Sequence, residues 1–485
     1  MTIRFVHAAD IHLGYRQYGS DQRYNDFASA FQALVDDTIA RDADFLLLAG
    51  DLFHKRAIDP LTLLQATLIL EDVKTAGIPV YAVQGNHERP HYTEHTSWLD
   101  YLAEMGLLRL LTARYREGDI IVEPWDPDTK RGAYVDLPGG IRVIGLQYFG
   151  ATTSRVVGDL VGALEEMPGP RPAYTILMMH AGLQGILDNY AATLSRAQLE
   201  PLRSHVDYVA LGHIHKPFRQ DDWIYNPGSP ETTGANEVAW EDRGYLVVDV
   251  DTARTPAHAV TTVQNPRRLF LRYPFAVDGY DTPEDLEAAL MRHLRTEVSD
   301  RIRDRKPVVE VELRGALPFS RADLDIGRLE KEVTGLFDAI LCRFKDGTVP
   351  SEFDIELSEN MTRADLERHV VRELVERDVR HRAQSEAWSD LILRLKDMAL
   401  TGSAPQEIVE ALGGFASLLA APQNGEEAAQ DGGDVPQQEQ VPVDGAGDGA
   451  SAEDGATAED DAVAEQPGMS ALEGTGPLEG TGEPC

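Results

Sequence analysis

The chain has 485 residues, 42% of them hydrophobic, so by the rough guide of about 150 residues per domain it can form about three domains, each with a core. Its formal net charge is −36, but residues 421–485 hold 16 Asp and Glu and no Lys or Arg; without these 16 acids the remaining chain stands at −20. A body this acidic excludes general binding of phosphate backbones through net charge, so an anionic substrate has to meet local cations.

The first 265 residues alternate between short apolar runs and helical patterns, which predicts an α/β domain. Apolar residues recur at helical spacing over 27–39 and 61–73. The runs that predict strands cover residues 3–6, 45–48, 80–83, 176–179 and 208–211.

The same alternation starts again at about residue 267 and continues to 357. It predicts a second, smaller α/β unit with helices that start at Pro283 and Ser320. The predicted strands of this unit cover residues 269–271, 308–311 and 340–342.

Residues 358–420 form a helical pattern. Thr362 and Asp365 match a capping box, Gly402 is expected to end the helical run, and a shorter helix is expected over 405–419. Apolar stripes on these helices either pack on their own domain or bind a partner. The stripes contain Leu366, Val370 and Leu374, then Trp388, Leu391, Ile392 and Leu395, then Ile408, Val409 and Leu412. Residues 421–485 are of low complexity, with Leu-Glu-Gly-Thr-Gly written twice, and are predicted to be disordered.

Residue types that bind hard or borderline metal ions follow all five predicted strands of the first domain. Because residues at the carboxyl ends of strands in an open α/β sheet converge on one crevice, we expect them to lie together. They are Asp10, His12, Asp51, Asn86, His180, His213 and His215. This set predicts two cations such as Mn²⁺ or Fe²⁺ with Asp51 between them. Gly50, Gly85 and Gly212 would let the chain turn sharply beside them.

A single histidine at a strand end is usually a surface or hydrogen-bonded residue, and His7, His91, His95, His205 and His258 are assigned to that class. The seven-residue set differs because several charges in one crevice need a cation to offset them. For His54, three residues after Asp51, the pattern leaves a structural and a functional role equally open.

Residues 291–306 form the most basic segment outside the tail. Its cations either contact the phosphates of DNA or form a solvated helix end. They are Arg292, Arg295, Arg301, Arg303, Arg305 and Lys306.

The two cysteines, Cys342 and Cys485, provide neither a disulfide framework nor a thiolate metal site, which fits a reducing cytosol. The first residues lack the apolar region of a signal peptide, and no apolar run approaches the roughly 18 residues of a membrane span. Export and membrane insertion are therefore not expected.

Asp10-x-His12, Gly50-Asp51, Gly85-Asn86-His87-Glu88, His180 and Gly212-His213-x-His215 resemble, in order, the motifs of the calcineurin-like metallophosphoesterases. Asp10-Ile-His-Leu-Gly-Tyr15, Ala49-Gly-Asp-Leu-Phe-His54, Gly212-His-Ile-His-Lys-Pro217 and Pro227-Gly-Ser229 are similar to the SbcD-type nuclease subunit of DNA double-strand break repair complexes. The resemblance covers about 420 residues. It departs after His180, where Ala181-Gly182-Leu183-Gln184-Gly185 replaces His-Gln-Gly, and in the acidic tail.

This resemblance implies a metallophosphoesterase sandwich, in which helices flank two central sheets. It implies a nuclease domain over 1–265, a small α/β DNA-facing cap over 266–357, a helical partner-binding segment over 358–420 and a disordered acidic tail over 421–485.

The resemblance also implies roles for the site residues. One metal would be held by Asp10, His12, Asp51 and His215, and the other by Asp51, Asn86, His180 and His213. Two Mn²⁺ are expected, with Fe²⁺ or Mg²⁺ as alternatives. His87 would be the catalytic histidine near the scissile phosphate, and His54 would position DNA for exonuclease action. Tyr15, Arg16 and Arg89 are further expected DNA contacts, together with Arg292, Arg295, Arg301 and Arg303.

The function that follows is a DNA exonuclease, with single-strand endonuclease activity, that acts at double-strand breaks. It would work as a homodimer in the cytoplasm, at the nucleoid, with an SbcC-like ABC-type ATPase bound through residues 362–420. Two alternatives stay open: a phosphoesterase acting on a nucleotide or another small phosphodiester, and a non-catalytic scaffold of the same fold.

Overall fold

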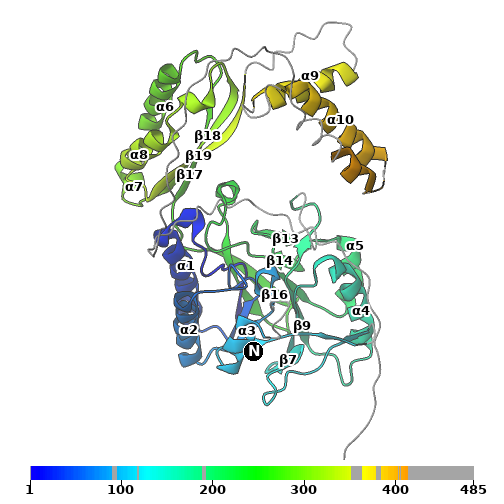
Figure 1. Ribbon diagram of the computed structural model, residues 1–485. Coiled ribbons are helices and arrows are strands. Elements are labelled where there is room, and N and C mark those ends of the chain that lie inside the picture. The colour runs from blue at the N-terminus through cyan, green and yellow to red at the C-terminus, as the bar shows by residue number, and fades with distance from the viewer. Residues whose placement is uncertain are drawn as a thin grey trace, which may run out of the picture. The chain divides into compact units, whose positions relative to one another are not determined.

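The computed structural model describes residues 2–89, 96–116, 119–187, 193–350, 363–377, 384–401, 404 and 406–412 (Figure 1). Its contacts divide the chain into two units, Met1–Leu357 and Ser358–Cys485. His91, His95, Thr362, Gly402 and the acidic tail lie outside the described residues.

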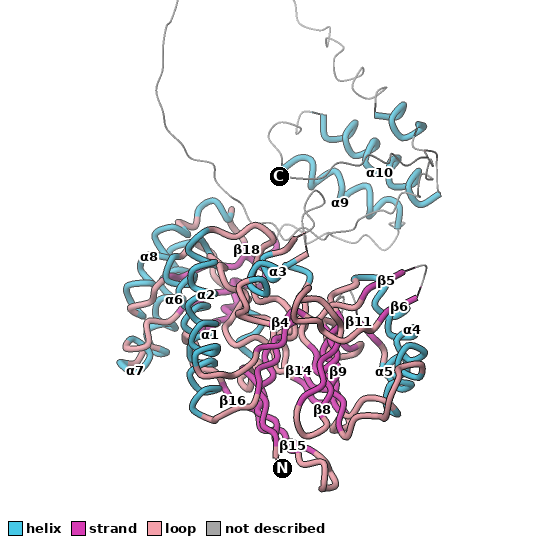
Figure 2. Tube along the Cα trace, turned by 90° about the horizontal axis from the view of Figure 1, so that it is seen from below, coloured by secondary structure: helices cyan, strands magenta, loops and turns pink. Residues whose placement is uncertain are grey.

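The first unit contains two six-stranded sheets that pack face to face (Figure 2). Apolar side chains from both sheets, among them Phe5, Phe45, Met178 and Tyr208, form the core between them. One sheet has the order β16-β15-β1-β2-β3-β4, with β16 at His258–Gln264, β15 at Gly244–Val250, β1 at Ile3–Ala8, β2 at Phe45–Leu48, β3 at Val80–Ala82 and β4 at Arg109–Leu110. The other has the order β13-β14-β12-β9-β8-β7, with β13 at Phe218–Gln220, β14 at Ile224–Asn226, β12 at Tyr208–Leu211, β9 at Tyr174–Met179, β8 at Ile141–Leu146 and β7 at Tyr134–Leu137.

Helices cover the outer face of each sheet, which completes the predicted sandwich. The first sheet packs on α1 (Asp21–Ala40), α2 (Pro60–Thr75) and α3 (Trp98–Glu104), and the second packs on α4 (Thr153–Glu165) and α5 (Arg196–Leu199). Ser20 and Asp59 cap α1 and α2 by accepting bonds from backbone N–H groups. Strands covered on both faces are mostly apolar, which made the five predicted strands recognisable in the sequence, and all five are confirmed.

Residues 270–350 form a separate three-stranded parallel sheet. Its strands are β17 (Phe270–Ala276), β18 (Val308–Leu317) and β19 (Leu341–Pro350). Helices α6 (Pro283–Glu297), α7 (Asp300–Arg303) and α8 (Ile326–Phe337) accompany it, and side chains of α6 and α8 share its apolar core. The helix predicted from Ser320 begins later, at Ile326, because Ser320 caps a short 3-10 turn and Asp325 caps the α-helix.

The second unit contains α9 (Arg363–Arg377), α10 (Ser385–Thr401) and a helical segment at 406–412. Two ion pairs join α9 to α10, Arg368 with Asp390 and Glu367 with Lys396. The residues of the predicted apolar stripes differ in burial: Leu391 is buried, whereas Leu374 and Ile392 are exposed. Within the described part of the chain, the helices lack the combined length and apolar character that crossing a bilayer requires.

Candidate metal centre

Two loops that follow β1 and β2 remain paired beyond the edge of the sheet. The backbone N–H of Asp10 donates to the Gly50 carbonyl at 3.1 Å, and that of His12 donates to the Asp51 carbonyl at 3.0 Å. The N–H of His54 closes the pairing on the Leu13 carbonyl at 2.9 Å. This pairing fixes the backbone from which Asp10, His12 and Asp51 project.

Four of the seven predicted metal ligands have left-handed backbone conformations. The φ angles are 56° at Asp10, 54° at His12, 54° at Asp51 and 82° at His213. Each such conformation in a non-glycine residue costs on the order of 1–3 kcal/mol and is found mainly at functional sites. The fold therefore holds these side chains in place against a local conformational cost.

The glycines beside the ligands leave room for close packing. A Cβ on Gly85 would lie 2.0 Å from Oδ1 of Asp51, and one on Gly50 would lie 2.3 Å from Nδ1 of His180. Gly50 also has a φ of 91°, which glycine adopts without strain.

All seven predicted ligands meet in one crevice at the carboxyl ends of the strands. Asp51 lies at its centre, with Oδ2 3.2 Å from Nε2 of His180 and 4.0 Å from Nε2 of His12. Three sets have ligand atoms within 4.8 Å of one another: Asp10, His12 and His215; Asp10, Asp51 and His180; and His12, His54 and His87. The Asn86 Oδ1 atom joins the crevice at 3.1 Å from Nε2 of His180 and 3.1 Å from Nδ1 of His213.

The donor set fits divalent cations. The Nδ1–H of His180 donates to the Ala49 carbonyl at 2.8 Å, so Nε2 is the ring nitrogen that faces Asp51 and Asn86 and that a metal ion would bind in place of a proton. His12 and His215 bring their Nε2 atoms to 3.0 Å from each other, a contact that places two potential ligand atoms side by side. Imidazole, carboxylate and amide donors on two neighbouring clusters suit two borderline-to-hard ions.

Burial perturbs the ionisation of the crevice. It raises the pKa of Asp10 to about 6. Burial, followed by the negative charge of Asp51, raises the pKa of Glu88 to about 7. Burial opposes protonation of His180, but the charge of Asp51 outweighs it and raises the pKa of His180 to about 9. A cation bound between these groups would replace the proton on His180 and offset the carboxylate charges.

His87 and His54 lie beside the clusters. The Nδ1–H of His87 donates to the His54 carbonyl at 2.7 Å, and Nε2 of His87 lies 3.9 Å from Oδ2 of Asp51. The His54 ring stacks on Tyr15 with ring centroids 3.8 Å apart. Burial lowers the pKa of His54 to about 3, so this ring is neutral.

The arginines among the expected DNA contacts have different surroundings. Arg16 forms an ion pair with Asp21 and lies over the Tyr24 ring. Arg89 is exposed directly after the turn that carries His87. On the three-stranded unit, Arg292, Arg295 and Arg301 are exposed, while Nε of Arg303 donates to the Leu336 carbonyl at 2.9 Å. Their role in DNA binding stays a prediction.

Among the described residues, the histidines assigned to structural roles include His7 and His258, which have hydrogen-bond partners. Both ring nitrogens of His7 lie within hydrogen-bond distance of partners, the Tyr208 hydroxyl at 3.1 Å and the Leu211 carbonyl at 3.0 Å. His258 lies between the hydroxyls of Tyr174 and Tyr225.

Two carboxylates at the site had no predicted role. Glu88 accepts bonds from the backbone N–H groups of Gly85, Asp51 and Phe53, and so ties the loops after β2 and β3 together. Its position directly after His87 could have indicated a role at the site. Glu237 lies 2.6 Å from Nδ1 of His215, and its distance of 22 residues along the chain gave no signal.

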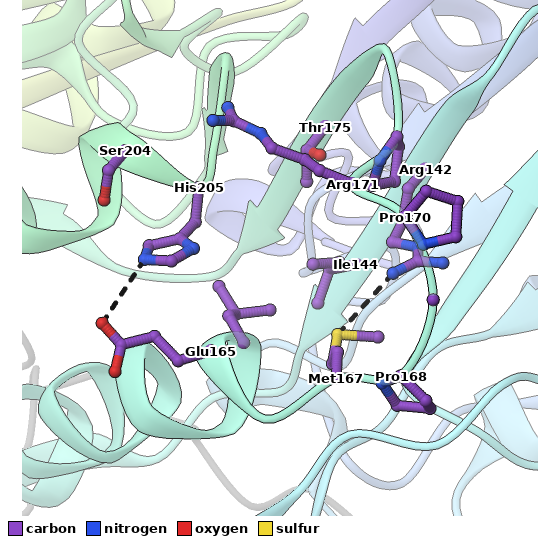
Figure 3. A pocket seen from close by; sticks show the side chains of 13 residues that line it. Arg142, Ile144, Glu165, Met167, Pro168, Pro170, Arg171, Thr175, Ser204 and His205 are labelled. Carbon is purple, nitrogen blue, oxygen red and sulfur yellow. Dashed lines mark hydrogen bonds and ion pairs between the residues drawn. The ribbon is translucent and has the colours of Figure 1, made fainter.

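A cavity of about 450 Å³ lies near Arg142, Glu165, Arg171 and His205, away from the crevice residues (Figure 3). Each basic side chain that lines it already has a carboxylate within 4 Å, which leaves little charge for an anionic ligand. The pairs are Arg142 with Asp136, Arg171 with Asp207, and His205 with Glu165.

Comparison with known proteins identifies one family. A model of the calcineurin-like phosphoesterase family matches residues 3–217. The DNA double-strand break repair protein Mre11 of Halobacterium salinarum is 40% identical over 303 residues, which is 61% of this chain and 68% of that protein. The Mre11 protein of Methanosarcina acetivorans is 31% identical over 301 residues, which is 60% of this chain and 44% of that protein. The chain thus spans about half the length of the curated relatives that it first matches.

Among solved structures, the calcineurin-like phosphoesterase YfkN from Bacillus subtilis aligns with a TM-score of 0.35 at 12% identity. The alignment covers 61% of this chain and 97% of that chain. This likeness is too distant to inform on the site.

Proposed function

This chain belongs to the Mre11 family of calcineurin-like phosphoesterases. On that premise, we propose that it is a metal-dependent nuclease that hydrolyses phosphodiester bonds at DNA ends in double-strand break repair. The observation that carries the proposal is the convergence of the seven metal-type side chains with His87 and His54 beside them. A crevice of this kind supplies both a metal centre and non-ligand groups for the substrate.

In this proposal the two cations are Mn²⁺, with Fe²⁺ or Mg²⁺ as alternatives. Asp10, His12, Asp51 and His215 hold one, and Asp51, Asn86, His180 and His213 hold the other. Bound there, the cations would lower the pKa of a water molecule and neutralise negative charge on the phosphate.

The protein's own groups orient and assist this chemistry. Because Nδ1–H of His87 donates to the His54 carbonyl, Nε2 is the ring nitrogen available to the substrate. When Nε2 carries a proton, it can donate that proton to the leaving oxygen or stabilise the negative charge there. The neutral His54 ring, held by Tyr15, positions the DNA strand beside His87. His87 is therefore assigned a catalytic role and His54 a positioning role toward DNA.

The proposal extends to the rest of the chain. Residues 1–265 form the nuclease domain, 266–357 a cap that faces DNA, and 358–420 the segment that binds an SbcC-like ABC-type ATPase. The exposed Leu374 and Ile392 support a protein partner for that segment. The protein would act as a homodimer at the nucleoid in the cytoplasm.

The test compares two substrates for one purified protein. End-labelled duplex DNA and bis(p-nitrophenyl) phosphate are each incubated with Mn²⁺ and with EDTA. We expect Mn²⁺-dependent shortening of the DNA from its ends. Hydrolysis of the small diester alone would favour the small-molecule phosphoesterase, and inactivity on both would favour the scaffold.

The His54→Ser variant separates the first two functions further. Because His54 lies beside the predicted ligands and stacks on Tyr15, its loss should slow DNA end cleavage more than hydrolysis of the small diester. An equal loss on both substrates would remove the DNA-positioning role.

A further inference from the structure

Glu237 is a buried carboxylate in a 3-10 turn, Ala235–Ala239, and is 3% exposed. Its Oε1 atom lies 2.6 Å from Nδ1 of His215. Its Oε2 atom accepts bonds from the backbone N–H of Thr233 at 2.9 Å, from Nη1 of Arg243 at 2.5 Å and from Oγ of Ser229 at 3.3 Å. Both oxygens are therefore used, and the carboxylate has a fixed orientation.

Arg243 holds Glu237 from behind. It is 1% exposed, and its guanidinium also donates to Oγ of Ser229 at 2.9 Å, to Oγ1 of Thr232 at 3.0 Å and to the Trp240 carbonyl at 3.0 Å. A buried charge pair with this many bonds permits little rotation of either group.

The contact with Glu237 determines which nitrogen of His215 faces the crevice. A carboxylate only accepts hydrogen bonds, so Nδ1 of His215 carries the proton. In the neutral ring, Nε2 then carries the lone pair, and it lies 3.0 Å from Nε2 of His12 and 3.9 Å from Oδ1 of Asp10. Thr233 lies close to both groups, with Oγ1 2.7 Å from Nδ1 of His215, and its hydroxyl proton goes to Glu237.

We propose that Glu237 is a positioning residue that holds His215 in its metal-binding tautomer and orientation, and that Arg243 anchors it. The inference rests on the proposed function only in taking His215 as a metal ligand. A carboxylate behind a ligating histidine typically raises metal affinity by about 10–100-fold. Neither group touches the substrate, so their effect reaches catalysis through the metal.

The experiment measures metal binding apart from nuclease activity. Mn²⁺ is titrated into metal-free full-length protein, and affinity and stoichiometry are measured for wild type and Glu237→Gln. We expect one of two sites to weaken by about 10–100-fold. The matched control is Glu231→Gln, because Glu231 is equally buried and pairs with Arg23, 3.0 Å away, but is not in contact with any predicted ligand.

The outcomes are distinct. Wild-type affinity at both sites in Glu237→Gln overturns the proposal, and so does an equal loss in Glu231→Gln, which would mark a general structural effect. If Glu237→Gln does not fold, Glu237→Asp is measured instead. The shorter side chain keeps the negative charge for Arg243 but withdraws it from His215. Unchanged Mn²⁺ affinity in Glu237→Asp would also contradict the proposal. Wild-type protein that binds two Mn²⁺ but cleaves no DNA would contradict the proposed function while leaving the positioning role intact.

Discussion

His87 is set apart from the predicted ligands by its surroundings. Its side chain is 36% exposed, while those of His12, Asp51 and His180 are at most 3% exposed. Its Nδ1–H is engaged by the His54 carbonyl. An open, oriented imidazole beside a buried cluster suits contact with the substrate.

The His87→Ala variant should therefore keep two bound metal ions and lose turnover. General acid catalysis contributes about 10²–10⁴-fold, so kcat should fall by a factor in that range. Metal analysis and steady-state kinetics on the same preparation check both parts. His205→Ala, which removes a histidine near Glu165, is the control and should change neither. Loss of a metal ion in His87→Ala would instead make His87 a ligand.

His7 provides a pH test that is separate from the site. Its Nε2 must donate to the Leu211 carbonyl, so Nδ1 accepts from the Tyr208 hydroxyl. Burial lowers its pKa from 6.5 to about 3. Between pH 6.5 and 3, His7 therefore binds a proton in the unfolded chain but not in the folded chain. The free energy of unfolding falls as the pH drops through this range. Urea unfolding at pH 7 and pH 5 should show a larger loss for wild type than for His7→Gln, and equal losses would contradict this.

Sequence adjacency decided which site residues could be predicted. Asp10, Asp51 and His180 lie within three residues of the ends of largely apolar strands, so strand order alone placed them at one edge. Glu237 and Arg243 reach the site through a loop and a 3-10 turn, and only tertiary contacts bring them to His215. Nothing in their local sequence indicates that contact.

Among the elements, the central strands were predictable and the outer ones were not. β9 and β12 are entirely buried and, apart from Thr175, apolar. β16, with alternating exposed and half-buried residues, and the short edge strand β13 carry too weak a pattern to be recognised. The predicted start of α8 failed because Ser320 and Asp325 are both good caps, and the first belongs to a short turn.

Arg268 connects elements that are far apart in the chain. Its guanidinium donates to both oxygens of Asp26 in α1, at 2.5 and 2.6 Å, and to the carbonyl of Lys306, at 2.8 Å, just before β18. Arg268→Ala should lower the free energy of unfolding by about 1–3 kcal/mol, because Asp26 loses a partner in a largely buried place. Arg114→Ala, which removes an exposed pair with Glu123, should change it little in the same denaturation experiment. Equal effects would contradict the distinction.

For the whole molecule, the apolar clusters locate the folding unit. All four clusters found among the described residues draw their members from residues 3–344. A chain ending at residue 357 should therefore melt within about 3 °C of the full chain and keep its Mn²⁺ binding. Thermal unfolding of both proteins checks this. A much lower melting temperature for the shorter chain would mean that α9 and α10 contribute to the core.

The central claim is that two metal ions at the Asp51 crevice drive cleavage of DNA. The most direct measurement follows the rate of end cleavage of duplex DNA while Mn²⁺ is added in known equivalents to metal-free protein, for wild type and Asp51→Ala. We predict that wild-type activity reaches its maximum at two equivalents, and that the folded Asp51→Ala variant binds neither ion and is inactive. Full activity at one equivalent, or two ions retained by Asp51→Ala, would contradict the account.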